Sequence, residues 1–95
     1  MDIGLAISNL RINRMKQKQG EFANNINITQ SYLSQIENGQ KKPSIELLQN
    51  IAIYMDIPLP VLFWFAISEN DVKHNKLEAF RTLKPTADTI INSIF

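Results

Sequence analysis

The chain has 95 residues, no cysteine, one histidine and a formal net charge of +1 at pH 7. This length predicts one small domain with a short appended segment and a modest core, so extra stability would come from self-association. The lack of cysteine excludes disulfides and thiolate metal sites and fits a reducing cytosol.

The start of the chain, Met1-Asp2, has no basic region followed by a long apolar run, so we expect no signal peptide. The longest apolar stretch covers residues 57–67, contains two prolines and is too short to cross a bilayer. We therefore expect a cytoplasmic protein without a membrane partner.

The small net charge hides an uneven distribution of charge. Residues 1–43 carry six basic and three acidic side chains, a net charge of +3, whereas residues 44–95 carry four basic and six acidic side chains, a net charge of −2. A polyanionic partner would therefore meet the N-terminal half of the chain.

Apolar residues at helical spacing begin the chain. Ile3, Ala6, Ile7 and Leu10 recur at intervals of three and four, which predicts an amphipathic first helix of about three turns. We interpret this helix as a packing element.

A second, shorter helix is predicted over residues 19–26, where Phe22, Ala23 and Ile26 share one face. Its start is weak, because Lys18 opposes the positive end of the helix dipole and Gly20 lies in the first turn. A phosphate bound at this point would account for the lysine; a frayed, exposed turn is the alternative.

The third helix has a marked start and a marked end. Thr29 can cap its first turn, and Ile28 and Leu33 have the spacing of a hydrophobic staple. Asn38-Gly39 supplies residues that adopt the left-handed conformation, and Pro43 prevents continuation. Between the second and third helices, Asn27 suits a tight turn.

The outer face of the third helix is polar but uncharged, with Ser31, Ser34, Gln35 and Asn38 opposite Leu33 and Ile36. Uncharged amides and hydroxyls suit base edges in a DNA groove, although ordinary surface residues would show the same pattern. Two short helices joined by a turn of about four residues form a helix-turn-helix unit, and this favours the first interpretation.

Several segments in order resemble the Cro/CI-type helix-turn-helix family, also called the Xre family. They are Gln19-Gly-Glu-Phe-Ala, Ile26-Asn-Ile-Thr-Gln-Ser-Tyr-Leu-Ser-Gln-Ile-Glu-Asn-Gly, Lys42-Pro-Ser-Ile-Glu-Leu-Leu and Ile51-Ala. The match covers about residues 3–65. It implies an all-α, five-helix lambda-repressor-like DNA-binding domain over residues 1–67, with one or two extra helices over residues 68–95.

The polar face of the third helix, the flanking lysines and the resemblance together predict roles for individual residues. Bases would be contacted by Gln30, Ser31, Ser34 and Gln35. Phosphates would be contacted by Lys18, Gln19, Thr29, Tyr32, Asn38, Lys41 and Lys42. Because glutamine offers a donor and an acceptor to adenine, Gln30 and Gln35 suggest half-sites that contain A·T pairs. For Tyr32, contact with a thymine methyl group and packing on a neighbouring helix are the alternatives.

In the family, an arginine near the end of the first helix forms a buried pair with the glutamate that closes the third helix. Arg11 and Glu37 are the candidates here. Arg11 lies eight residues before Gln19, one more than the family pattern, so we expect a longer loop and keep Arg14 as a rival partner.

Ser44 is expected to cap a fourth helix that buries Ile45, Leu48, Ile51, Ala52 and Met55, and Asp56-Ile57-Pro58 should end it. A fifth helix follows from Leu59, with Pro60 in its first turn. It is apolar nearly all round, so one face should meet a second subunit or the C-terminal segment. Leu62 is assigned to the core. The dimer-interface candidates are Phe63, Trp64 and Phe65.

Residues 69–95 lie outside the resemblance. Ser68-Glu-Asn-Asp has the pattern of a capping box, and Val72, Leu77, Phe80 and Leu83 suggest a sixth helix. Pro85 would begin a seventh. The residues predicted to line that helix are Ala87, Ile90, Ile91, Ile94 and Phe95. Such an apolar segment should dock on its own domain or on a partner.

The residue inventory gives little support to an enzyme. The only histidine, His74, lies in a polar stretch, and no HExxH or phosphate-loop spacing occurs, so we expect no catalytic residue, metal or cofactor. We expect a sequence-specific regulator of transcription that binds double-stranded DNA, acting as a repressor and a homodimer on an inverted repeat. The alternative is a protein-interaction module, such as the antitoxin of a toxin pair, whose C-terminal helices cover a protein partner (a toxin or a regulator).

Overall fold

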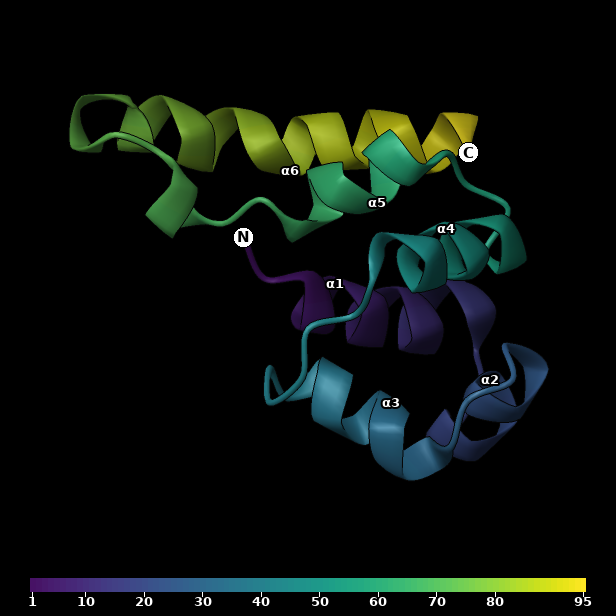
Figure 1. Cartoon of the computed structure of the whole chain (residues 1–95). Helices are drawn as coiled ribbons and strands as arrows, with labels where there is room; N and C mark the ends of the chain where they lie inside the picture. Colours follow the sequence, from purple (N-terminus) through teal and green to yellow (C-terminus); the bar gives the residue numbers. More distant parts are fainter.

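The computed structural model describes all 95 residues, and every regular element in it is helical (Figure 1). The α-helices are α1 (Ile3–Leu10), α2 (Gln19–Asn25), α3 (Gln30–Glu37), α4 (Ile45–Tyr54), α5 (Leu59–Ala66) and α6 (Leu77–Ile94). A π-helical turn, Arg11–Met15, follows α1, and two 3₁₀ turns, Glu69–Asp71 and His74–Lys76, precede α6. Figure 1 shows α2 and α3 at one end of the molecule, α6 at the opposite end, and α1, α4 and α5 between them.

One hydrophobic core joins the first five helices. Its largest fully buried side chains are Phe22, Ile7, Leu33, Ile36, Ile51, Met55 and Leu62. The assignment of Leu62 to the core is confirmed. The assignment of Ile45 to the buried side was wrong: the residue is 63% exposed, because the first residue of α4 precedes the turn that reaches the core.

No single helix is long and apolar enough to span a membrane; α4 and α5 meet that length and composition only as a pair bent by 102°.

The predicted helix boundaries are confirmed at both ends of the third helix. The Thr29 hydroxyl accepts a hydrogen bond from the Tyr32 N–H at 3.0 Å, and Gly39 has a φ of +78°. Asn27 adopts the left-handed conformation, with a φ of 60°, in the turn between α2 and α3. Lys18 makes no side-chain hydrogen bond to the start of α2, as its residue type predicts.

The expected longer loop after the first helix is absent. The chain stays helical as a π turn from Arg11 to Met15 and ends at Lys16, whose φ is 57°. A π turn accommodates one additional residue within a helix, so the extra residue lengthens a helix instead of a loop. Arg14, within this turn, donates from Nε to the Met55 carbonyl oxygen (3.1 Å) and from Nη2 to the Phe95 carbonyl oxygen (2.6 Å). The turn thereby connects the ends of α4 and α6.

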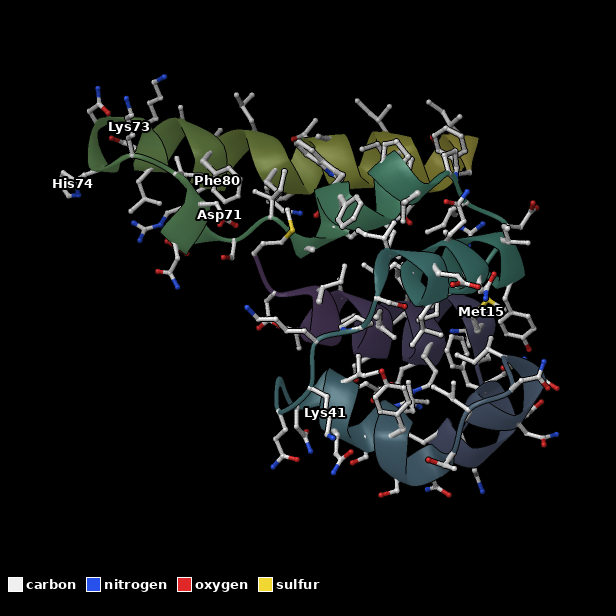
Figure 2. All side chains as sticks on the ribbon, in the orientation of Figure 1. Met15, Lys41, Asp71, Lys73, His74 and Phe80 are labelled. Atoms are coloured by element: carbon white, nitrogen blue, oxygen red, sulfur yellow. The ribbon has the colours of Figure 1, made fainter.

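The C-terminal segment forms one helix, and the prediction of a seventh helix beginning at Pro85 was wrong. Pro85 lies inside α6, where it removes one backbone hydrogen bond. The helix continues because Phe80 and Ile91, on either side of the proline, are half-buried on the same face. Val72 lies between the two 3₁₀ turns and not in a helix, and the Ser68–Asp71 capping box forms on the first of those turns. Figure 2 shows Phe80 between α6 and the segment that carries Asp71.

The C-terminal helix docks on α5 of its own chain. The Trp64 indole N–H donates to Asp88 Oδ1 at 2.8 Å, and Lys84 Nζ lies 5.3 Å from the centre of the Trp64 ring and 5.9 Å from that of Phe65. Of the two occupants expected for the apolar face of α5, the C-terminal segment is therefore the one that contacts Trp64 and Phe65. Phe63 is half-buried.

Candidate nucleic-acid interface

The outer face of α3 lies at the end of the molecule opposite α6 (Figure 1). Leu33 and Ile36 anchor the helix in the core, with at most 1% of either residue exposed. On the other side, Gln30 and Ser31 are exposed, and Ser34 and Gln35 are half-buried. The N-terminal half of α3 thus presents an uncharged hydrogen-bonding surface to solvent, the arrangement with which a recognition helix meets base edges.

A buried ion pair fixes the C-terminal end of α3. Arg11 Nε donates to Glu37 Oε2 at 2.8 Å and Nη2 donates to Oε1 at 3.0 Å, while Nη1 donates to the Gln17 carbonyl oxygen at 2.9 Å. Only 9% of the Arg11 side chain and 5% of the Glu37 side chain are exposed. The rival, Arg14, contacts α4 and α6 instead. The two-point geometry fixes both distance and angle between α3 and the π turn.

Gln19 belongs to the same network. Its side-chain amide donates to Glu37 Oε1 at 3.0 Å, so this group faces the buried pair and not the solvent. The backbone N–H of Gln19 lies in the first turn of α2 and has no partner within the helix. If Gln19 contacts a phosphate, the backbone N–H is therefore the group positioned to do so.

Gly4 allows the backbones of α1 and α3 to meet, and Gly20 lies beside the Gln30 side chain; neither role was predicted from the sequence. A Cβ atom on Gly4 would lie 3.0 Å from the Glu37 carbonyl oxygen and closer still to that of Ile36, so α1 and α3 meet through their backbones. A Cβ atom on Gly20 would lie 3.1 Å from Gln30 Oε1. Gln30, a predicted base-contacting residue, thus lies over the first turn of α2.

Exposed lysines lie on the segments next to α3 in the chain and not on its uncharged face. Lys18, Lys41 and Lys42 are all exposed, and Figure 2 shows Lys41 beside one end of α3. The Gln35 carbonyl oxygen accepts hydrogen bonds from the N–H groups of Gln40 (2.8 Å) and Lys41 (3.2 Å). These bonds hold the start of the loop that carries Lys41 and Lys42, hereafter the lysine loop, against the helix. Cations at the edges and neutral polar groups in the centre suit phosphates and bases respectively.

The remaining predicted phosphate contacts differ in accessibility. Thr29 and Asn38 are exposed at the two ends of α3. Tyr32 is half-buried and packs against the hydrophobic core, so packing accounts for most of its surface. No group of three or more His, Cys, Asp or Glu side chains is placed to hold a metal ion.

Comparison with known proteins agrees with this geometry. A helix-turn-helix family model of the Xre/Cro-CI type matches residues 7–62, which include α2, α3 and the lysine loop. The ImmF control region 10 kDa protein of Bacillus phage phi105 is 44% identical over 45 residues, which cover 47% of this chain and 50% of the relative. The chain thus spans about half the length of this curated relative. No solved structure matches the chain. The protein belongs to the Xre/Cro-CI type helix-turn-helix family of DNA-binding transcriptional regulators.

Proposed function

We propose that the protein is a repressor that binds an inverted repeat in double-stranded DNA as a homodimer. The observation that carries this proposal is the uncharged, exposed N-terminal half of α3, which is held rigidly by the Arg11–Glu37 pair and flanked by exposed lysines. One short helix contacts only a few base pairs, so a second copy adds affinity and makes half-site spacing part of the specificity. The name of the phage relative, a control region protein, supports a regulatory role.

Within this proposal, Gln30, Ser31, Ser34 and Gln35 contact bases. Gln30 and Ser31 are the most accessible of the four, which favours them for the contacts nearest the centre of the groove. Phosphates are bound by the backbone N–H of Gln19 and by Lys18, Thr29, Asn38, Lys41 and Lys42, with a smaller contribution from the half-buried Tyr32. The side-chain amides of Gln30 and Gln35 match adenine, so we propose half-sites with A·T pairs.

The test is selection of a random duplex library near physiological salt with the wild type, the Gln30→Ala, Gln35→Ala double variant, and Gln49→Ala as a matched control. Gln49 is an exposed glutamine on α4, away from α3. We expect the wild type and Gln49→Ala to enrich the same inverted repeat. The double variant should lose preference at symmetric positions by about 5- to 150-fold, the range of one bidentate base contact. Sequence-independent binding by all three proteins would refute the proposal.

The alternative is a protein-interaction module, such as an antitoxin, in which DNA binding is secondary. The exposed apolar residues Leu83, Ile90 and Ile94 on α6 favour a protein contact at that end of the molecule. Residues 68–95 would then cover a toxin or another regulator. Failure of the purified protein to select any duplex, with selection restored by a co-expressed neighbour, would favour this alternative.

A further inference from the structure

The C-terminal helix is unusual among the helices of this protein. It is the longest, with 18 residues, yet none of its residues is buried, whereas each of the other α-helices buries at least two. The side that faces α5 is only half-buried, and an apolar row beside it is exposed: Leu83 (64%), Ile90 (54%) and Ile94 (67%). The half-buried Ala87 lies in the same row. The apolar face of α6 is thus wider than the part of it that packs against its own chain. This indicates that a partner covers the rest of the face.

The chemistry of this row also differs from that of a solvated helix. Residues 85–95 contain a single charged residue, Asp88, which accepts hydrogen bonds from Trp64 and Lys84 of the same chain. Apart from the partly exposed Asp88, the surface of the last three turns therefore carries no charged side chain. Surface helices ordinarily carry charged residues on their solvent face, and uncharged apolar surface of this kind marks an interface.

The exposed area agrees with an absent partner. The chain exposes 6229 Å², whereas a compact monomer of 10.9 kDa exposes about 5,600 Å². The excess, roughly 600 Å², approaches the area of about 800 Å² that each partner buries in a stable protein–protein interface.

We propose that the row Leu83, Ala87, Ile90 and Ile94, hereafter the α6 seam, binds the α6 seam of a second copy in an antiparallel helix pair. The residues follow one another at intervals of four, three and four, the spacing of a coiled-coil seam. In the antiparallel register, Leu83 meets the second copy's Ile94, and Ala87 meets the second copy's Ile90. The small side chain of Ala87 then faces the larger side chain of Ile90, and no charged side chains face one another across the seam.

This inference rests on the dimeric state in the proposed function and names the surface that produces it. It replaces the aromatic face of α5 as the interface, because Trp64 and Phe65 are engaged by α6 of their own chain. Since α6 lies at the end of the molecule opposite α3 (Figure 1), pairing through the seam leaves both recognition helices uncovered. The same helix pair then sets the separation between them.

The first experiment measures the oligomeric state of the full chain by sedimentation equilibrium for the wild type, Ile90→Glu and Thr89→Glu. Thr89 is the exposed neighbour of Ile90 on the polar side of α6, so Thr89→Glu adds the same charge outside the seam. We expect Ile90→Glu to weaken dimerisation by roughly 30-fold or more. Thr89→Glu should stay within about threefold of the wild type. Fluorescence of Trp64, the only tryptophan, reports whether α6 stays docked in each variant.

The second experiment tests the register by disulfide formation. The chain contains no cysteine, so cross-links arise only at introduced positions. When Leu83→Cys and Ile94→Cys are mixed and oxidised, we expect the mixed dimer to exceed either symmetric dimer. A wild type that remains monomeric at several hundred micromolar, or equal dimerisation of both glutamate variants, would overturn the proposal. Sequence-independent DNA binding by a wild type that dimerises as expected would instead refute the proposed function alone.

Discussion

The Gly4→Ala substitution tests how the position of α3 is determined. The added Cβ would lie 3.0 Å from the Glu37 carbonyl oxygen and would overlap the Ile36 carbonyl oxygen by about 1 Å relative to an ordinary carbon–oxygen contact of ~3.3 Å. Both neighbours are backbone atoms within the core packing of α1 on α3, so no side chain can rotate away. The helices must separate.

The expected cost is that of overpacking, about 1–3 kcal/mol, reduced by about 0.5–1 kcal/mol because alanine favours the helix over glycine. The net loss is therefore at most about 2.5 kcal/mol, and its central value of about 1 kcal/mol lowers the Tm of a domain of this size by roughly 4 to 8 °C. Binding to the selected duplex should also weaken at temperatures well below the Tm, because α3 no longer occupies its native position relative to the lysine loop.

Gly20→Ala provides a matched control, measured beside Gly4→Ala by thermal unfolding followed by circular dichroism. Both glycines are the second residue of their helix, so both variants gain the same intrinsic helix preference. The atom nearest to Gly20 is the end of the flexible Gln30 side chain, which can move by a few tenths of an ångström. We expect Gly20→Ala to keep or slightly raise the Tm while altering preference at the base that Gln30 is proposed to contact. Equal Tm values and equal DNA affinities for the two variants would refute the reasoning.

Three further outcomes follow from named contacts. Glu37→Ala leaves the buried Arg11 unpaired and should cost about 3–5 kcal/mol in urea unfolding; a cost below about 1 kcal/mol would contradict the buried pair. Lys41→Ala should reduce the slope of log affinity against log salt by about 1 for every duplex tested, since the exposed Lys41 is proposed to bind a phosphate. The hydrogen bond from the Met1 amino group, together with hydrogen bonds from Ser68, lowers the pKa of Asp71 below its ordinary value of 3.8. The contact therefore stabilises the fold above pH 3.8, and this stabilisation is lost as the pH falls through the lowered pKa. Acetylation of Met1 should move the Asp71 midpoint towards 3.8 in an NMR titration, and an unchanged midpoint would exclude that cause.

Elements whose determinants are local could be predicted from the sequence. Thr29 and Ser44 cap helices through bonds to residues three positions later, and Asn27 and Gly39 adopt the left-handed backbone that their residue types favour. Pro85 shows the limit of local reasoning. A proline is compatible with the first turn of a helix and tolerable within one, and only the packing of residues on both sides of it decides between them.

The orientation of α3 depends on contacts between residues distant in the chain, and these were harder to predict. The Arg11–Glu37 pair was accessible through family resemblance, but the competing assignment to Arg14 could be resolved only once the π turn was known to absorb the extra residue. The role of Gly4 could not be predicted, because a glycine in the first turn of a helix gives no indication of which backbone will approach it.

The backbone approach at Gly4 and a network centred on Glu37, which accepts hydrogen bonds from Arg11 and from the Gln19 amide, hold α3 before any DNA is bound. A recognition helix fixed in this way loses little conformational freedom on binding, so more of the interaction free energy of its side chains is available for affinity. Gln30 is the exception, because its long side chain rests on Gly20 and can shift without disturbing the backbone. Base preference at that position should therefore be easier to alter than the orientation of the helix, through substitutions at position 20 as well as at position 30.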